Sequence, residues 1–196
     1  MHKKSTLNVL DFGGSAGIQY LFAKKLLGQD TKIKWHIVET EMMVNEAKKN
    51  NLENEELKFF TSIDAAKKTI KEFDLAYANS ALTYTDDPIK YLQDLLNVSF
   101  DTLYITRTPL NEKSREHIIG LQLSKLSENV QWRMPENLDI QDELVKIPFT
   151  AISKEVLEEM ITKYGEIKFF TREEKGTYWT KIGNFNMFGY VLKKTN

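Results

Sequence analysis

The chain of 196 residues contains no cysteine, and this absence excludes several kinds of chemistry. Without thiols there is no disulfide framework, no thiolate zinc site and no cysteine nucleophile. Histidine is also scarce. The three histidines, His2, His36 and His117, are too scattered along the chain to suggest a metal cluster, so we expect no metal site.

The sequence also lacks an excess of charge of one sign and a long hydrophobic run. Its 27 basic and 28 acidic residues give a formal net charge of −1. No segment approaches the roughly 18 consecutive apolar residues of a membrane span, and the first residues lack the apolar core of a signal peptide. A near-neutral chain has no excess of positive charge with which to bind nucleic acid or anionic membranes. We therefore expect a cytoplasmic protein that neither binds nucleic acid nor spans a membrane.

Short apolar runs typical of buried strands alternate with segments whose apolar residues recur at helical spacing. The expected strands are residues 7–12, 33–39, 57–62, 75–80 and 102–108. The expected helices are residues 18–27, 41–50 and 63–71, and a fourth that begins at Pro88 after Asp87 as its cap. Strands that alternate with helices form a parallel sheet, and right-handed crossovers place helices on both of its faces. The pattern predicts the α/β class.

The pattern changes after the fifth strand. Residues 112–126 are expected to be helical, and residues 129–150, with few periodic apolar side chains, are expected to form a partly ordered insertion. Ser153 is suited to cap a further helix, and residues 166–171 and 186–193 are expected to close the fold as an antiparallel hairpin. The sheet then has seven strands, and residues 1–196 form one domain with a substrate-side insertion at 111–150.

A glycine-rich turn separates the first strand from the first helix and contains Gly13, Gly14 and Gly17. Open α/β sheets bind ligands at this edge, where glycine lets the backbone approach a ligand and the helix N-terminus offers free N–H groups. The same glycines would also suit a simple tight turn. Glu39 favours a nucleotide-type ligand, because a carboxylate at the end of the second strand can accept hydrogen bonds from both hydroxyls of a ribose.

Asp11 discriminates among nucleotide-type ligands. A carboxylate just before the glycines would repel the pyrophosphate of NAD or FAD, whereas it would suit a ligand that carries an ammonium and a sulfonium group. No Gly-Lys-Ser/Thr follows the turn, so a phosphate-binding P-loop is absent. S-adenosylmethionine is the cofactor that fits best. A nicotinamide-dependent oxidoreductase is a weaker alternative, which the spacing of the glycines permits only loosely.

These motifs resemble the class I S-adenosylmethionine-dependent methyltransferases, whose first motif is an acidic residue followed by a glycine-rich turn. Within that superfamily the sequence resembles a bacterial group commonly encoded among genes for surface-polysaccharide biosynthesis. The segments that carry the resemblance are LDFGG at 10–14, WHIVETEM at 35–42, LKFF at 57–60, SALTY at 80–84 with Asp87-Pro88, and YITRTP at 104–109.

The resemblance spans almost the entire chain and implies a Rossmann-like class I methyltransferase fold. It also implies a methyltransferase that acts on a small molecule or a glycan precursor. The alternative is a catalytically silent module that binds S-adenosylmethionine and regulates or scaffolds a partner, because the sequence offers no compelling general base.

The resemblance also implies which residues contact the cofactor. Those expected around its methionine part are Asp11, Gly13, Gly14, Ser15 and Gly17. Those expected elsewhere are Glu39 at the ribose, Thr40, Met42, Ser62 and Ile63 around the adenine, and Asn79 and Ser80 beside the methyl group. Ser62 stands where the superfamily usually has an acidic or amide side chain.

On the acceptor side, the protein mainly has to align the acceptor and shield the site, so a general base is optional. Tyr84, after the fourth strand, could contact the acceptor or simply close the core. Arg107, at the end of the fifth strand, could clamp a carboxylate or phosphate, or pair with a nearby acid. His117 is a weak candidate for a base, and His36 is expected to be structural.

The acceptor pocket has few other sources in the sequence. Only six residues precede Leu7, so we expect the pocket to be built from residues 129–150 or by a partner subunit, which could be a second copy of the chain. Trp132 and Met134 could form pocket walls or pack against the edge of the sheet.

Overall fold

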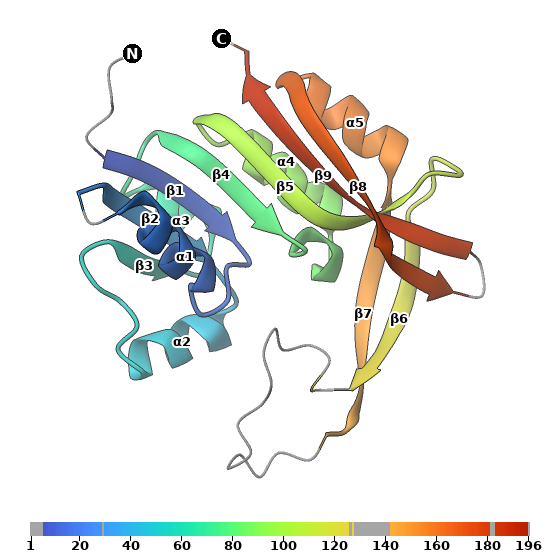
Figure 1. The fold of residues 1–196 in the computed structure, drawn as a ribbon, viewed down its shortest axis with the longest axis horizontal. Coiled ribbons are helices and arrows are strands. Elements are labelled where there is room, and N and C mark those ends of the chain that lie inside the picture. The colour runs from blue at the N-terminus through green and yellow to red at the C-terminus, as the bar shows by residue number, and fades with distance from the viewer. Residues whose placement is uncertain (1–5, 29, 126, 128–141, 181–182, 196) are drawn as a thin grey trace.

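The computed structural model describes residues 6–28, 30–125, 127, 142–180 and 183–195 (Figure 1). The strands are β1 (Thr6–Phe12), β2 (Lys32–Val38), β3 (Leu57–Phe60), β4 (Phe73–Asn79), β5 (Phe100–Asn111), β6 (Ile118–Lys125), β7 (Leu144–Ser153), β8 (Gly165–Thr180) and β9 (Gly183–Lys194). The helices are α1 (Ile18–Leu27), α2 (Glu41–Lys49), α3 (Ile63–Lys67), α4 (Pro88–Leu96) and α5 (Lys154–Thr162), with a 3-10 turn, η1 (Leu82–Tyr84). Among the described residues, no helix is long and apolar enough to cross a membrane.

The strands form one sheet with the order β3-β2-β1-β4-β5-β7-β6, and β9 pairs with both β5 and β8. Strands β1 to β5 pair in parallel, whereas β9 runs antiparallel to β5 and β8. This confirms the predicted mostly parallel sheet with a C-terminal antiparallel hairpin. Strand order reverses at β1, which lies between β2 and β4, and such a switch point leaves a crevice at the carboxyl ends of the strands.

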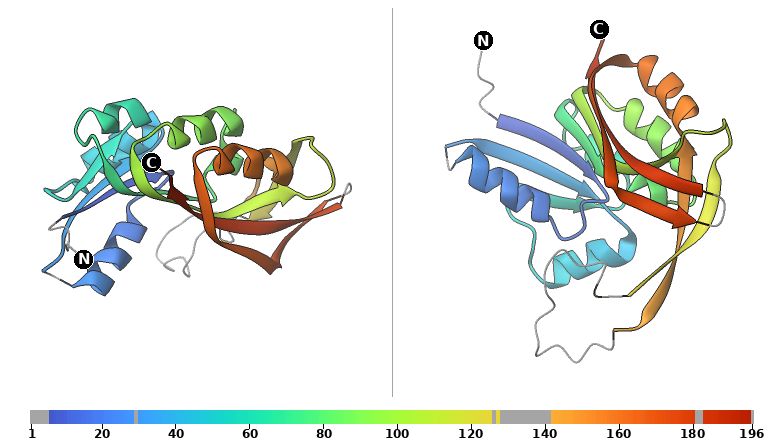
Figure 2. Two further views of the ribbon diagram at one scale, coloured as in Figure 1. Left: turned by 90° about the horizontal axis from the view of Figure 1, so that it is seen from above. Right: turned by 45° about the vertical axis from the view of Figure 1, so that its right-hand side comes forward.

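Helices cover both faces of the sheet, as predicted, because successive strand residues point to opposite faces. On one face, α1 and α2 place Tyr20 and Val44 in a cluster with Val9 of β1. On the other, α3, α4 and α5 pack in a cluster that includes Leu10 of β1 and Leu92 of α4. Figure 2 shows α1 on the opposite side of the sheet from α4 and α5.

The prediction of a helix at residues 112–126 is wrong. Ile118–Lys125 is strand β6, which pairs antiparallel with β7, and β7 in turn joins β5 through two residue pairs. The apolar residues Ile119, Leu121 and Leu123 alternate with a period of two, which is the strand signal that the helical interpretation overlooked. We call β6 and β7 together the arm. It raises the strand number from the expected seven to nine in the described chain.

Residues 144–150 of the expected insertion are therefore regular structure, because they belong to β7 (Leu144–Ser153). Trp132 and Met134 lie outside the described residues. Two predicted helix caps are confirmed. The Asp87 side chain accepts a hydrogen bond from the backbone N of Lys90, and the Ser153 side chain accepts one from the backbone N of Val156.

Candidate cofactor site

A cleft of about 840 Å³ opens at the carboxyl ends of β1 to β4, the edge that the strand order favours. Pockets of this size hold ligands as large as a nucleoside derivative. The predicted site residues that line it are Gly13, Ser15, Glu39, Thr40, Ser62, Ile63, Asn79, Ser80 and Tyr84. The predicted residues that lie outside its lining are Asp11, Gly14, Gly17, Met42 and Arg107.

Glu39 joins the end of β2 to the glycine-rich turn. Its Oε1 accepts a hydrogen bond from the backbone N of Ser15 at 3.0 Å, and its Oε2 accepts one from the backbone N of Thr40 at 2.9 Å. The carboxylate is therefore fixed at the rim of the cleft. Each oxygen of the carboxylate can accept a further hydrogen bond, so the two oxygens together can accept hydrogen bonds from two adjacent hydroxyl groups.

The glycine-rich turn packs directly against the segment that follows β4. A Cβ on Gly13 would lie 2.3 Å from the Cβ of Ala81, and the φ of Gly13 is 72°, so this position requires glycine. Ser15 also has a positive φ, of 50°, in the left-handed region where a side chain is strained. Its hydrogen bond to Glu39 helps to hold that conformation. Strain of this kind is typical of functional sites.

Asp11 lies behind the turn and is almost fully buried. Its Oδ2 accepts a hydrogen bond from Nε1 of Trp35 at 2.8 Å, and its Oδ1 has no partner in the described part of the chain. Burial raises the pKa of Asp11 to about 7, the Trp35 hydrogen bond opposes that shift, and the charge of Glu39 adds to it. A Cβ on Gly14 would lie 2.5 Å from Asp11 Oδ2, so the carboxyl supports the turn from below.

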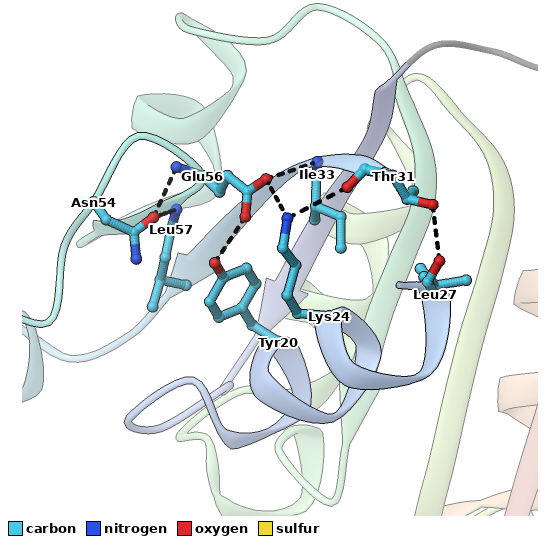
Figure 3. A network of polar contacts seen from close by, with 8 residues as sticks. All are labelled: Tyr20, Lys24, Leu27, Thr31, Ile33, Asn54, Glu56 and Leu57. Carbon is cyan, nitrogen blue, oxygen red and sulfur yellow. Dashed lines mark hydrogen bonds and ion pairs between the residues drawn. The ribbon is translucent and has the colours of Figure 1, made fainter. Parts of the chain in front are cut away.

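A hydrogen-bond network centred on Glu56 anchors α1, the helix that directly follows the glycine-rich turn (Figure 3). The Glu56 carboxylate accepts hydrogen bonds from the hydroxyl of Tyr20 at 2.9 Å, from Nζ of Lys24 at 2.7 Å and from the backbone N of Ile33 at 3.4 Å. The hydrogen bond from Lys24 is the main cause of the lowered pKa of Glu56. Because Glu56 precedes β3 whereas its partners come from α1 and β2, its role was not apparent from the sequence.

Two more strained residues, one directly after β4 and one at an irregularity within β5, are bonded to each other. Ser80 and Arg107 have positive φ values of 56° and 53°, and Ser80 Oγ donates to the backbone O of Arg107 at 3.0 Å. The register between β5 and β9 shifts at this point. The Arg107 side chain is exposed. Beside Ser80, Asn79 Oδ1 is buried with no hydrogen-bond partner among the described residues.

Helix α4 also contributes to the cleft, which the sequence analysis missed. Lys90, Tyr91 and Asp94 line it, together with Asp86 just before the helix. Lys90 Nζ pairs with Asp94 at 2.8 Å, and the rings of Tyr91 and Phe12 lie 5.3 Å apart. The available signal was the polar side of α4, which faces away from the buried leucines of this helix. The helix is the first one after the end of β4, separated from it by η1.

The two described histidines lie outside the cleft lining. His36 is buried beside Phe60 and Phe73, and this burial lowers its pKa to about 4, so it is neutral and structural as predicted. Nδ1 of His117 accepts a hydrogen bond from the backbone N of Ser153 at 2.9 Å. His117 thus caps the entry to α5, and its position outside the cleft lining does not favour this weak candidate for a base.

Comparisons with known proteins found similarity only at the level of structure. No protein-family model and no curated protein matches the sequence. An S-adenosylmethionine-dependent methyltransferase from Methanosarcina mazei superposes with a TM-score of 0.57 at 15% identity, over 98% of this chain and 94% of that one. The N-terminal domain of EvdMO1, with S-adenosylhomocysteine bound, gives a TM-score of 0.57 at 13% identity, over 96% of this chain and 75% of that one.

A third solved structure is the glycopeptide N-methyltransferase MtfA in complex with S-adenosylhomocysteine. It superposes with a TM-score of 0.54 at 12% identity, over 95% of this chain and 82% of that one. At such low identity the similarity concerns the fold and not the activity. The chain has the Rossmann-like fold of class I methyltransferases.

Proposed function

We propose that the protein is an S-adenosylmethionine-dependent methyltransferase that binds its cofactor in the cleft at the carboxyl ends of β1 to β4. The observation that carries the proposal is the position of Glu39. Its carboxylate is fixed by the backbone N–H groups of Ser15 and Thr40 at the rim of a cleft of about 840 Å³. In this fold, a carboxylate at the end of the second strand is suited to the two hydroxyls of a ribose.

The residues of the cleft fit this cofactor better than they fit a dinucleotide. Glu39, Asp64, Asp86 and Asp94 line the cleft, and Lys90, the one lysine in its described lining, is paired with Asp94 at 2.8 Å. Such a lining would repel a pyrophosphate but attracts a ligand with a sulfonium and an ammonium group. Two of the structural neighbours, the EvdMO1 domain and MtfA, contain S-adenosylhomocysteine, which also supports the assignment.

We assign the predicted residues to parts of the cofactor as follows. The backbone of Gly13 and Ser15 would hold the methionine part, Ser62 and Ile63 the adenine, and Asn79 and Ser80 the region of the sulfur. Asp11, Gly14 and Gly17 would act by shaping the turn, since they lie outside the cleft lining. Thr40 would border the adenine, and Met42, whose side chain is largely exposed, would lie at the outer edge of that site.

The cofactor supplies a methyl group that its sulfonium already activates, so the residues of this chain mainly align the acceptor and exclude water. Tyr84 lines the cleft after the end of β4 and is assigned to the acceptor side. The buried Oδ1 of Asn79 can accept a hydrogen bond from an N–H or O–H of the acceptor. Arg107 would form an outer contact for an acceptor that extends beyond the cleft.

The proposed acceptor is a small molecule or a glycan precursor. MtfA is a glycopeptide N-methyltransferase, and the EvdMO1 domain has also been crystallised in the presence of D-fucose. A role in surface-polysaccharide biosynthesis belongs to the proposal through the sequence resemblance alone. The proposal also makes residues 111–150, which include most of the arm, the acceptor-side insertion of one domain, which a partner subunit could complete.

The test is calorimetric titration with S-adenosylhomocysteine, with NAD as the control ligand. We expect the wild-type protein to bind S-adenosylhomocysteine and not NAD. Glu39→Ala should weaken that binding by about tenfold to a hundredfold, because hydrogen bonds to a charged group are lost. The matched control is Glu46→Ala on the exposed side of α2, which should bind like the wild type.

Two outcomes would contradict the proposal. Binding of NAD alone would overturn the choice of cofactor, and equal affinity of wild type and Glu39→Ala would overturn the site. Incubation with S-adenosylmethionine labelled in its methyl group and a panel of sugar, amine and phenol acceptors then tests transfer. Cofactor binding without transfer to any of them would favour the silent module instead.

A further inference from the structure

The arm is bonded to the wall of the cleft through two consecutive residues of η1. The buried Oγ1 of Thr83 donates a hydrogen bond to the backbone O of Thr150 in β7 at 2.6 Å. The hydroxyl of Tyr84 donates one to Oε1 of Gln122 in β6 at 2.9 Å. Figure 1 shows that β6 and β7 extend away from the parallel part of the sheet. A residue of the arm therefore determines the position of a group on the cleft wall.

The backbone of η1 is held without any help from Gln122. Leu82 is fully buried in the main hydrophobic cluster, and Thr83 is 1% exposed with its hydroxyl bonded to β7. The side chain of Tyr84, in contrast, is 41% exposed, so packing constrains its ring less. The hydrogen bond to Gln122 contributes to fixing where the phenol hydroxyl lies.

Gln122 is itself fixed by the pairing of the arm. It lies opposite Ile147, and the next pair on the same face of the arm is Gly120 with Phe149. A Cβ on Gly120 would lie 2.7 Å from Cε1 of Phe149, so the buried phenylalanine ring packs directly on the glycine backbone. A slip of β6 by one residue would put a side chain where that ring lies, so the register that places Gln122 beside Tyr84 is well specified.

We propose that Gln122 is a positioning residue for the acceptor, and that it acts by holding the hydroxyl of Tyr84 at the acceptor side of the cleft. This inference rests on the proposed function and extends it, because it makes the arm part of the acceptor site. A phenol bonded to a carboxamide is a neutral hydrogen-bonding pair, which suits a neutral polar group on the acceptor, such as a sugar hydroxyl. It carries no positive charge to pair with a carboxylate or phosphate.

The test compares Gln122→Ala, Gln122→Glu and a control, Leu123→Ala, which removes an exposed side chain from the opposite face of the same strand. In protein with carbon-13-labelled tyrosine rings and saturating S-adenosylhomocysteine, Tyr84→Phe identifies the Tyr84 signal. We expect Gln122→Ala to shift that signal and Gln122→Glu, which keeps an acceptor oxygen, to restore most of it. Leu123→Ala should leave it unchanged. An identical Tyr84 signal in Gln122→Ala and wild type overturns the proposal, whichever acceptor the enzyme uses.

A kinetic experiment complements the spectroscopic one. It uses methyl glycosides as neutral acceptors, with matched sugar phosphates for comparison. We expect Gln122→Ala to raise the KM for the glycoside by about tenfold, the effect of one lost hydrogen bond, with the KM for S-adenosylmethionine unchanged. Gln122→Glu should recover most of the loss. Preference for sugar phosphates, or weaker S-adenosylhomocysteine binding in Gln122→Ala than in Leu123→Ala, contradicts the inference. Failure of the wild type to bind S-adenosylhomocysteine contradicts the proposed function instead.

Discussion

At the residue scale, Asp11 is the most unusual group in the structure. Its carboxyl is 1% exposed and accepts one hydrogen bond, from Trp35, while its other oxygen has no partner among the described residues. The ionised carboxylate loses its hydration on burial and gains only one hydrogen bond from the described residues in return. Burial therefore raises the pKa of Asp11 to about 7. A cationic ligand close to the turn would stabilise the ionised form. Asp11 therefore links the pH, the stability of the protein and the charge of the ligand.

This raised pKa predicts the pH dependence of stability. Because the folded protein holds the proton of Asp11 more tightly than the unfolded chain, its contribution to stability is complete below about pH 4 and is lost as the pH rises through about 7. Relative to Asp11→Asn, the wild type should lose about 2 to 3 kcal/mol of unfolding free energy between about pH 5 and pH 8.

Urea unfolding of the two proteins at both pH values measures that difference. Asp64→Asn, which replaces a carboxyl on the exposed side of α3, is the control and should follow the wild type. Parallel pH profiles for wild type and Asp11→Asn would show that Asp11 is not the group responsible.

At the element scale, the decisive contact is the one that holds α1 against β2 and the start of β3. The N-terminus of α1 shapes the glycine-rich turn, but its only buried side chain is Tyr20, so packing alone holds this helix weakly. The Glu56 carboxylate compensates by joining Tyr20 and Lys24 of α1 to the backbone of Ile33. The position of the turn thus depends on a residue that lies outside the cleft lining.

We expect Glu56→Ala to lower the unfolding free energy by about 1 to 2 kcal/mol, since it removes a partly buried network rather than a surface ion pair. The matched control is Glu46→Ala. Glu46 pairs with Lys49, an exposed lysine that also lies on α2, so its replacement should lower the unfolding free energy by less than about 0.5 kcal/mol. Denaturant titration of both variants tests this difference. Equal effects would mean that the network contributes no more than a surface pair.

At the scale of the whole molecule, the arm and the parallel sheet are joined unequally. Strand β1 pairs with a neighbour on each side, whereas the arm joins β5 only through Leu110 with Ile152 and Asn111 with Ser153. Segments with few connecting hydrogen bonds open locally without global unfolding. We therefore expect the arm to open locally more often than the parallel sheet. This difference is expected even though η1, which follows β4, is hydrogen-bonded to the arm.

Hydrogen–deuterium exchange measures this difference directly. Amides of β6 should exchange markedly faster than those of β1 and β4, and saturating S-adenosylhomocysteine should slow exchange in the glycine-rich turn and in η1. Uniform protection of β6 and β1 would show that the arm is as firmly joined as the central strands. Ligand protection confined to the arm would contradict the location of the cleft.

Much of the fold and part of the site could be determined from the sequence, because the signals involved are local. The alternation of strands and helices, the caps Asp87 and Ser153, the glycine-rich turn and Glu39 at a strand end all lie within short segments. In a parallel α/β sheet, the ends of successive strands necessarily meet at one edge. That rule brings Gly13, Glu39, Ser62 and Asn79 together without further information.

Only the tertiary structure decided the rest, because it depends on pairs of residues that are distant in the sequence. Strand β6 acquires its regular structure by pairing with β7, and no periodicity in one segment identifies its partner. The burial of Asp11 depends on Trp35 in the neighbouring strand, and the contact of Tyr84 with Gln122 depends on where the arm crosses η1. Local patterns specify which segments are strands and turns, whereas the packing of distant segments decides which groups face each other across the cleft.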